Sequence, residues 1–281
     1  MKKSTFRILV TGASSGIGYS VAETLARMGH TVFAGARRVS LMEPLKAAGV
    51  TPLFLDVCDE QAVDACLAQA GPLDVVINNA GFGYFGAIEN VPMEEARRQM
   101  EVNLFGLAIL CRKVLPAMRE QGFGKIINIS SVAGKACMYF GGWYNVSKYA
   151  VEAFSDALRI EVKPFGVDVV LIEPGGIRTD WGIIAADHLE ESSRGTAYEE
   201  EALREAATMR KGYSSDLLAP PEAVTRAILR AVRARQPRAR YLTGSGAHLV
   251  VFFHTLLPTR WWDALVRLLA SKPVARIAER L

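Results

Sequence analysis

Short apolar segments that alternate with helix-like segments are the feature that most restricts how this chain can fold. Because nearly every position in these segments is hydrophobic, both faces of the sheet that they form must be covered. Strands separated by helices favour a parallel sheet with right-handed connections. The sequence therefore predicts an α/β, doubly wound parallel sheet of about seven strands: 6–10, 31–35, 51–57, 73–78, 124–130, 166–174 and 238–244.

Helical periodicity fills most of the intervals between these strands. The clearest helical patterns cover Ile17–Met28, Glu94–Arg119 and Trp143–Lys163. The polar stretch Thr179–Ser215 is expected to form a lid outside the sheet, and the residues after Gly246 are expected to form two amphipathic helices divided at Pro258. We therefore expect one domain over 1–245, with the lid at 179–215 inserted, and a C-terminal helical extension of that domain over 246–281.

The composition is that of an ordinary globular protein and excludes few functions. The chain has 281 residues, a net charge of +4 and 50% hydrophobic residues, a balance that gives no reason to expect nucleic-acid binding. No apolar run approaches the roughly 20 residues of a transmembrane helix, and Phe6–Val10 is too short for an export signal. Four unpaired-looking cysteines and four scattered histidines suggest a cytoplasmic protein without a metal site.

A glycine-rich turn, TGASSGIG at 11–18, lies between the first strand and the first helix. Gly12, Gly16 and Gly18 permit a tight turn and close approach of the backbone to a ligand. The free N–H groups and positive dipole end of the helix favour a phosphate, which Ser14, Ser15 and Ile17 would surround. Ordinary strand-to-helix turns also use glycine, but the strand–turn–helix context favours a Rossmann-type dinucleotide site.

The end of the second strand bears on which dinucleotide is bound. Enzymes that select NAD usually carry an acidic residue here, whereas this chain has Arg37 and Arg38, which favour the 2′-phosphate of NADP. Asp56 and Val57 follow the third strand and are expected to cover the adenine, although an ordinary strand end would look similar. The fourth strand runs into Asn79, Ala80 and Gly81, a turn that lets a ribose or ring approach.

Tyr144 and Lys148 are four residues apart in a helical pattern, so their side chains share one face. Such a pair is either ordinary helix surface or a phenol whose pKa a neighbouring ammonium lowers. Ser131 stands at the end of the fifth strand, where a helix cap is also common. Asn103 lies inside a helical stretch, where asparagine is unfavourable, and this indicates another role.

Taken together, these segments resemble the short-chain dehydrogenase/reductase family in its compact single-domain branch. The resemblance is carried by TGASSGIG, NNAG, Asn103, the NISS segment that ends at Ser131, Tyr144 and Lys148 in YNVSK, and PGGIRT at 174–179. The motifs occur in the order and spacing of the family, over about the first 180 residues and again at the seventh strand.

The resemblance implies a role for each of these residues. Tyr144 would protonate the carbonyl oxygen as hydride arrives, with Lys148 and an oxidised nicotinamide lowering the phenol's pKa. Ser131 would hold the substrate oxygen, and Asn103 would hold a water that links Lys148 to solvent. Cofactor contacts would come from Tyr144 and Lys148 themselves and from the loop that includes Pro174, Gly175, Ile177 and Thr179.

The resemblance also suggests a substrate class and an assembly. Aromatic and methionine side chains near the site suit a lipophilic ketone, aldehyde or alcohol of steroid, retinoid or acyl-chain type: Phe82, Tyr84, Phe85, Met138, Tyr139, Phe140, Trp143 and Trp181. We thus expect an NADP(H)-dependent oxidoreductase, assembled as a homodimer or homotetramer through two central helices. The alternatives are a catalytically silent NADP(H) sensor and a peripheral membrane protein.

Two basic or apolar segments near the C-terminus stay open in interpretation. The arginines at 230, 233, 235, 238 and 240 favour a solvated face, with an acidic carrier protein as a lesser alternative. The stripe of Trp261, Trp262, Leu265, Leu268 and Leu269 could roof the substrate pocket, join a partner subunit or lie on a membrane, with an ordinary docked helix favoured.

Overall fold

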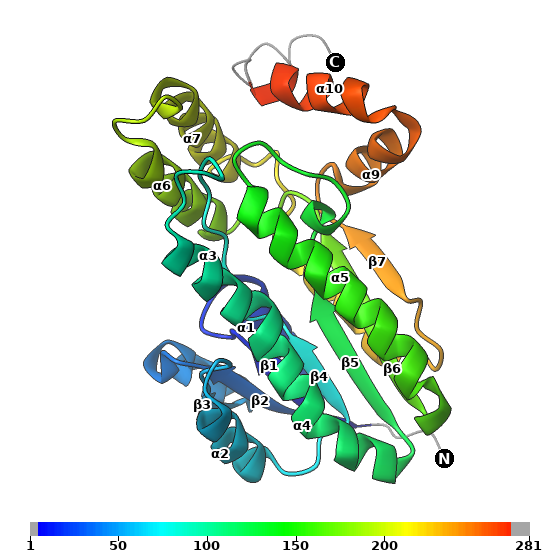
Figure 1. Ribbon diagram of the computed structural model, residues 1–281. Helices are drawn as coiled ribbons and strands as arrows, with labels where there is room; N and C mark the ends of the chain where they lie inside the picture. The colour runs from blue at the N-terminus through cyan, green and yellow to red at the C-terminus, as the bar shows by residue number, and fades with distance from the viewer. Residues whose placement is uncertain (1–4, 271–281) are drawn as a thin grey trace.

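The computed structural model describes residues 5–270, which fold around one parallel sheet of seven strands (Figure 1). The strand order is β3-β2-β1-β4-β5-β6-β7, which confirms the predicted doubly wound architecture. The strands are β1 Arg7–Thr11, β2 Thr31–Ala36, β3 Thr51–Phe54, β4 Val75–Asn78, β5 Gly124–Ile129, β6 Val167–Pro174 and β7 Arg240–Thr243.

The central strands are apolar because both of their faces are buried. Leu9 of β1 pairs in register with Phe33 of β2 and Val76 of β4, and all three side chains are buried. The order changes direction at β1 and β4, and ligands bind at such a switch point beyond the carboxyl ends of the strands. The sheet thus brings the glycine-rich turn and the ends of β4, β5 and β6 to one edge.

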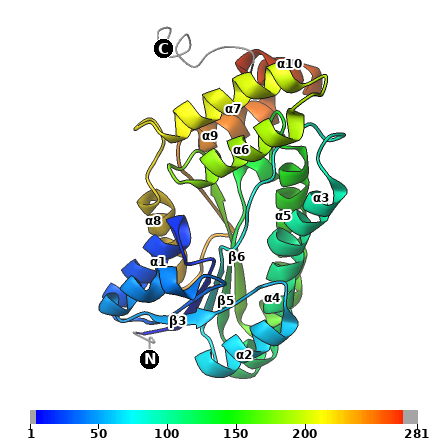
Figure 2. The same ribbon diagram turned by 90° about the vertical axis from the view of Figure 1, so that its left-hand side faces the viewer.

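Helices cover the two faces of the sheet (Figure 2). One face carries α1 Gly16–Arg27, α8 Glu222–Arg233 and the 3-10 helix Val39–Ala48, and the other carries α2 Glu60–Ala70, α4 Gly106–Gln121 and α5 Gly142–Val162. The sequence did not predict α2 or α8 as helices. In α8 the arginines obscured a buried stripe of Val224, Ala227, Ile228 and Ala231, which has helical spacing.

The single helix predicted over Glu94–Arg119 is divided in the structure. It consists of α3 Met93–Met100, a π-helical turn Glu101–Phe105, and α4. Asn103 lies at the centre of the π turn and is buried. Such turns are rare and are found mostly at functional sites, so this departure from the regular helix marks the position of Asn103.

Four further helices lie at the end of the molecule toward which the strands point (Figures 1 and 2). We call α6 Trp181–Ser193 and α7 Glu199–Tyr213 the cap, and α9 Ala247–Leu256 and α10 Thr259–Ala270 the tail. The two tail helices and their division at Pro258 were predicted correctly. In the part of the chain that the structure describes, every helix is too short or too polar to cross a bilayer.

Candidate active site

The glycine-rich turn packs directly on the end of β4. Gly12 has a φ of 65°, and a Cβ placed there would lie 2.8 Å from Cα of Ala80. Gly16, which opens α1, has a φ of 56°, and a Cβ on Gly18 would lie 2.6 Å from the carbonyl oxygen of Gly12. Side chains are therefore excluded from the turn, as a pyrophosphate cradle at a helix N-terminus requires. Ser15 is the N-cap of α1, but its side chain makes no capping hydrogen bond.

Thr11 and Asn79 connect this turn to the NNAG segment. The Thr11 hydroxyl accepts hydrogen bonds from the backbone N–H groups of Asn79 (3.0 Å) and Ala80 (2.9 Å). The side-chain amide of Asn79 donates to the carbonyl oxygen of Thr11 at 2.9 Å. The sequence reading missed Thr11 as a site residue, although it opens the motif. These bonds hold the turn and Gly81 in one rigid edge.

The residues predicted to select the cofactor surround the same edge. Arg37 and Arg38 are exposed at the end of β2, and Nη2 of Arg38 lies 3.5 Å from Oγ of Ser14 in the glycine-rich turn. Asp56 is half-buried, and its Oδ1 accepts the backbone N–H of Cys58 at 3.0 Å. Arg38 thus lies beside the glycine-rich turn, and Arg37 is its exposed neighbour in the sequence.

Ser131, Tyr144 and Lys148 come together from two elements. Lys148 and Tyr144 project from α5, and Nζ of Lys148 lies 5.7 Å from the centre of the Tyr144 ring. The ammonium group of Lys148 donates to the carbonyl oxygen of Ile129 at the end of β5, at 2.9 Å. Each of the three catalytic candidates is at least nine-tenths buried. Their shared enclosure gives the arrangement a low dielectric and little competing water.

Ser131 holds both a structural and a chemical position. Its hydroxyl donates to the carbonyl oxygen of Pro174 at 3.3 Å and accepts the backbone N–H of Ala133 at 3.1 Å, as the N-cap of a 3-10 turn. The cap interpretation of Ser131 is thus correct locally, and the same hydroxyl also interacts with Tyr144. The cap fixes the serine rotamer that faces the phenol.

Burial has the largest effect on the pKa values of Tyr144 and Lys148. Burial raises the pKa of Tyr144 well above its usual value, and interaction with the Ser131 hydroxyl only partly opposes this. Burial also lowers the pKa of Lys148 to about 8, while Glu152 acts in the opposite direction. Without a bound cationic ring, the phenol therefore stays protonated near neutral pH. The predicted lowering of this pKa includes an oxidised nicotinamide beside the phenol, and it stays a prediction.

Asn103 uses its whole side chain to hold neighbouring elements. Its Oδ1 accepts the backbone N–H of Phe82 at 3.0 Å, and its Nδ2 donates to the carbonyl oxygen of Phe82 (2.9 Å) and to Oγ of Ser147 (3.0 Å). Ser147 follows Tyr144 by three residues on α5 and was not singled out from the sequence. Asn103 thus ties the NNAG segment to the catalytic helix, and its role in holding a water stays a prediction.

The loop after β6 reaches across to the glycine-rich turn. Gly175 donates its N–H to the carbonyl oxygen of Thr243 at 2.8 Å, and Ile177 is buried in the core. A Cβ on Gly16 would lie 3.6 Å from Cγ2 of Thr179. Pro174 to Thr179 therefore runs from Ser131 to the phosphate turn, the path that a nicotinamide half would follow between them.

Comparison with known proteins agrees with this geometry. The family model described as short chain dehydrogenase matches residues 7–188, which is more than half of the chain. The chain belongs to this family. Short-chain dehydrogenases bind a nicotinamide cofactor, so this protein is an oxidoreductase of that family.

Relatives and a solved structure extend the match beyond the family model. A 3-ketodihydrosphingosine reductase of Bacteroides thetaiotaomicron is 44% identical over 177 residues, 61% of this chain and 64% of that protein. An NADPH-dependent 3-dehydrocapnine reductase of Ornithobacterium rhinotracheale is 35% identical, over 92% of this chain and 94% of that protein. A short-chain dehydrogenase structure from Streptomyces avermitilis has a TM-score of 0.78 and 32% identity, covering 95% of this chain and 99% of that one.

The residues predicted to line the substrate pocket of this dehydrogenase fall into two separate clusters. Phe85, Met138, Tyr139, Phe140 and Trp181 share a cluster with Tyr144. Phe82, Tyr84 and Trp143 belong to another cluster, beside α3. The two groups were expected in one pocket, and the structure places only the first against the phenol.

Trp181 covers Tyr144 from the cap side. Its ring centre is 4.9 Å from that of Tyr144 and 5.8 Å from that of Phe85. Tyr213 at the end of α7 lies 6.3 Å from Trp181, and its ring contacts the backbone of Gly182. Nothing in the lid sequence distinguished Tyr213, because it is one polar-stretch residue among many. The cap therefore encloses the phenol with aromatic surface.

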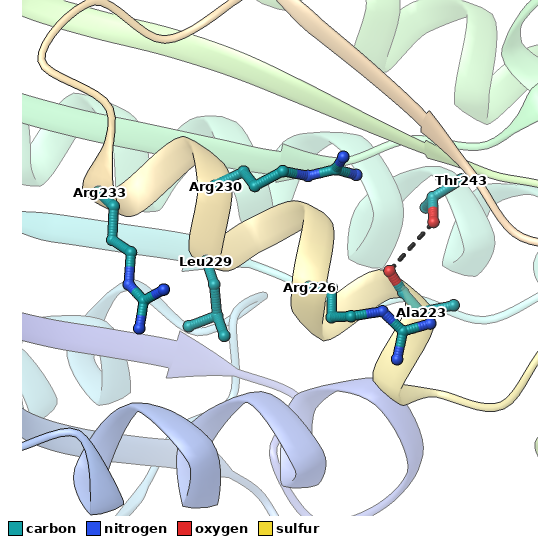
Figure 3. Close-up of a pocket in the computed structure, with 6 residues that line it drawn as sticks. All are labelled: Ala223, Arg226, Leu229, Arg230, Arg233 and Thr243. Atoms are coloured by element: carbon teal, nitrogen blue, oxygen red, sulfur yellow. Dashed lines mark hydrogen bonds between the residues drawn. The ribbon is translucent and has the colours of Figure 1, made fainter.

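A shallow cavity of about 410 Å³ lies away from this enclosed site, on α8 of the dehydrogenase (Figure 3). It is lined by Ala223, Arg226, Leu229, Arg230, Arg233 and Thr243. All three arginines project from α8, and the Thr243 hydroxyl donates a hydrogen bond to the carbonyl oxygen of Ala223 at one end of the cavity. Arg230 and Arg233 are exposed, as the predicted solvated face requires. The prediction was wrong for Arg240, which is half-buried because it forms ion pairs with acidic side chains of α5 and β6.

Proposed function

We propose that this dehydrogenase uses NADPH to reduce a lipophilic ketone to the corresponding secondary alcohol. The observation that carries the proposal is the buried phenol of Tyr144, which stays protonated beneath a wall formed by Phe85 and Trp181. A protonated phenol suits the role of general acid in reduction. An apolar enclosure with one or two polar groups suits a lipophilic carbonyl compound.

Each polar residue of the site has a distinct task in this proposal. The bound nicotinamide supplies the hydride. Ser131 donates a hydrogen bond to the substrate oxygen and holds it beside the phenol, while Tyr144 delivers the proton to that oxygen. Lys148 stabilises the phenolate that remains, since its ammonium nitrogen lies 5.7 Å from the centre of the Tyr144 ring. Asn103 keeps the catalytic helix aligned with the NNAG segment.

NADPH is proposed over NADH because of charge. Arg37 and Arg38 stand where NAD-selective enzymes carry an acidic residue, and Arg38 reaches the glycine-rich turn. The name of the 3-dehydrocapnine reductase specifies NADPH for that relative.

The substrate is proposed to be a 3-oxo compound with an acyl-chain-like apolar part. Two relatives are named for a 3-keto or 3-dehydro compound, which supports acyl-chain types over the steroid and retinoid types. Phe85 and Trp181 supply apolar side chains next to Tyr144, and the buried alanines and Leu189 of the cap pack behind them.

A series of 3-oxo compounds of increasing chain length tests this function. We expect NADPH oxidation to rise by about fourfold in kcat/KM for each methylene that the pocket buries, because each contributes roughly 0.8 kcal/mol. Tyr144→Phe is the control and should lose about 10²–10⁴-fold in kcat. Equal rates in the wild type and Tyr144→Phe would show that Tyr144 takes no part in the reaction. A kcat/KM that does not change with chain length would contradict a lipophilic substrate.

A homodimer or homotetramer is also proposed, through α4 and α5. The outward face of α5 exposes Val146, Tyr149 and Ile160, and Phe105 is exposed just before α4. Apolar side chains in such positions are typical of subunit interfaces. Light scattering of the purified protein would measure the assembly directly.

A further inference from the structure

The first tail helix turns its apolar stripe toward solvent. Leu249, Phe252, Phe253 and Leu256 follow one another at the spacing of one helix face. They are 64%, 59%, 41% and 64% exposed. A surface helix of a globular protein normally turns such a stripe onto the core. The apolar face of α9 is therefore left uncovered by the described residues.

The second tail helix continues the same kind of surface. Trp261 is 69% exposed, and Leu268 and Leu269 are also exposed. Arg260 and Arg267 lie among them in sequence, are exposed, and form no ion pair within the described residues. The two tail helices contact each other elsewhere, through His254 and Trp262, whose ring centres are 5.1 Å apart. Asp263 lies between the two arginines and is also exposed, so the exposed face combines aliphatic and aromatic side chains with a net positive charge.

The position of the tail links this surface to the active site. The backbone N–H of Gly176, in the loop after β6, donates to the carbonyl oxygen of Ser245 at 2.9 Å, two residues before α9 begins. The Ser245 hydroxyl donates to the carbonyl oxygen of Leu217 at 3.1 Å, and Leu217 is itself 71% exposed. α9 also packs against the turn that follows Ser131. The apolar surface thus lies at the same end of the molecule as the catalytic groups and the cap (Figures 1 and 2).

We propose that the tail docks this enzyme onto the surface of a bilayer that contains anionic lipid. Leucine and phenylalanine side chains of α9 would enter the boundary between headgroups and acyl chains, with Trp261 at the headgroup level. Arg260 and Arg267 would pair with lipid phosphates. The helices lie on the membrane and do not cross it, in agreement with their ten and twelve residues.

Charge favours a bilayer over a second copy of the chain. A twofold interface brings a patch against the same patch of its partner. In such a dimer, Arg260 and Arg267 of one copy would lie near the same two arginines of the other copy. Asp263 is the acidic residue that the described tail helices offer to offset this repulsion. An anionic lipid surface neutralises both arginines instead.

Vesicle flotation tests the proposal without requiring enzymatic activity. The variant is Phe252→Glu/Leu256→Glu, and the matched control is His248→Glu/Thr255→Glu, which adds two glutamates to the same helix on its exposed polar side. Wild type and control should float with vesicles of phosphatidylcholine and phosphatidylglycerol. The partition coefficient of the variant should be lower by about tenfold or more, because it lacks two apolar side chains that the bilayer would bury. Phosphatidylcholine alone, or high salt, should weaken binding of the wild type.

Each contrary result has a definite meaning. A wild type that stays unbound, or a variant and control that float equally, overturns bilayer docking by this face. If light scattering without lipid shows that Phe252→Glu/Leu256→Glu has a lower mass than the control, while the wild type ignores vesicles, the face pairs copies of the chain and the proposal is wrong. Melting temperatures of the two double variants keep misfolding separate, since all four positions are exposed. Turnover is measured separately, so a failed reductase assay leaves the docking result intact.

Discussion

At the carboxyl end of the sheet, the side chains of Asn103, Ser131 and Lys148 are fixed by hydrogen bonds to backbone groups, whereas the cap above them is fixed by apolar packing. We call these three residues and Tyr144 the floor of the site. On the floor, Lys148 is bonded to Ile129, Ser131 to Pro174, and Asn103 to Phe82. In the cap, Trp181 makes ring contacts, and buried alanines and Leu189 complete the cluster.

The difference between the two regions indicates which part sets the reaction and which sets the substrate. Hydrogen bonds have narrow geometry, so the floor holds the reacting groups in one arrangement. Apolar packing tolerates changes of shape when the volume is conserved. Changes on the floor should therefore alter the rate of every reaction, and changes in the cap should alter the choice of substrate.

The largest effect should follow from Lys148→Met, which keeps the length of the side chain and removes its charge. We expect kcat to fall by about 10²–10⁴-fold for all substrates, because the phenolate loses its neighbouring cation. Steady-state kinetics of NADPH oxidation measures this. Lys163→Met, an exposed lysine near the end of α5, is the control and should stay within about twofold. If the fall in kcat differs between substrates, Lys148 contributes to substrate recognition, and the division of roles between floor and cap is wrong.

Cofactor choice should show the next largest effect. Arg37→Asp should lower the preference for NADPH over NADH by roughly tenfold or more, since a charge-assisted contact to the 2′-phosphate is replaced by repulsion. The ratio of kcat/KM values with the two cofactors measures the change. Arg226→Asp on α8 alters the net charge equally, but in the cavity of Figure 3, and should leave the ratio unchanged. If both variants change the ratio alike, the long-range field of the protein selects the cofactor.

A pair of tryptophans tests the cap directly. Trp181→Ala should raise KM for a long-chain 3-oxo compound by about tenfold and leave a small ketone nearly unaffected, since Trp181 covers Tyr144 with apolar surface. Trp143→Ala should change KM by less than about twofold, because Trp143 packs beside α3 in the other cluster. Equal effects would mean that the substrate reaches both clusters.

The floor could be predicted from the sequence because its chemistry needs particular residue types at fixed spacings. The four-residue interval placed Tyr144 and Lys148 on one helix face, and the resemblance to the short-chain dehydrogenase/reductase family placed Ser131 beside the phenol. The rise in the pKa of Tyr144 could not be predicted from the sequence. The burial that causes it comes from residues far from Tyr144 in the sequence, such as Trp181 and Tyr213.

The cap and tail show the limits of sequence periodicity. The stripe over Leu249–Leu256 predicts an amphipathic helix, but periodicity gives no information on whether that stripe meets protein or solvent. The separation of Trp143 and Trp181 into two packing clusters could not be predicted either, because aromatic composition near a motif does not distinguish side chains that pack against different helices. The helix α8 was missed because its arginines concealed the buried alanine and valine positions.

A network of ion pairs lies next to the floor, one turn further along α5. Glu152, one turn after Lys148, places Oε2 2.7 Å from Nζ of Lys135 and 3.0 Å from Nη2 of Arg240. Glu173 shares both partners, at 3.4 Å from Lys135 and 3.1 Å from Arg240. Burial and the charge of Glu152 raise the pKa of Glu173 to about 7. Glu152 also raises the pKa of Lys148 against the lowering by burial.

The smallest predicted effect is a shift of the pH profile in Glu152→Gln. Burial lowers the pKa of Lys148 to about 8, so its ammonium form is lost as the pH rises through that value. Removing the negative charge of Glu152 lowers this pKa further, and kcat should begin to fall at a lower pH, by less than about one pH unit. The shift is small because Glu173, relieved of its acidic neighbour, ionises more readily and replaces part of the lost charge. Asp156→Asn removes a charge that pairs with Arg240 in the same network at 2.7 Å, and it should leave the alkaline limb in place. Identical pH profiles of kcat for the two variants would show that the ion-pair network does not affect the pKa of Lys148, and that burial alone sets it.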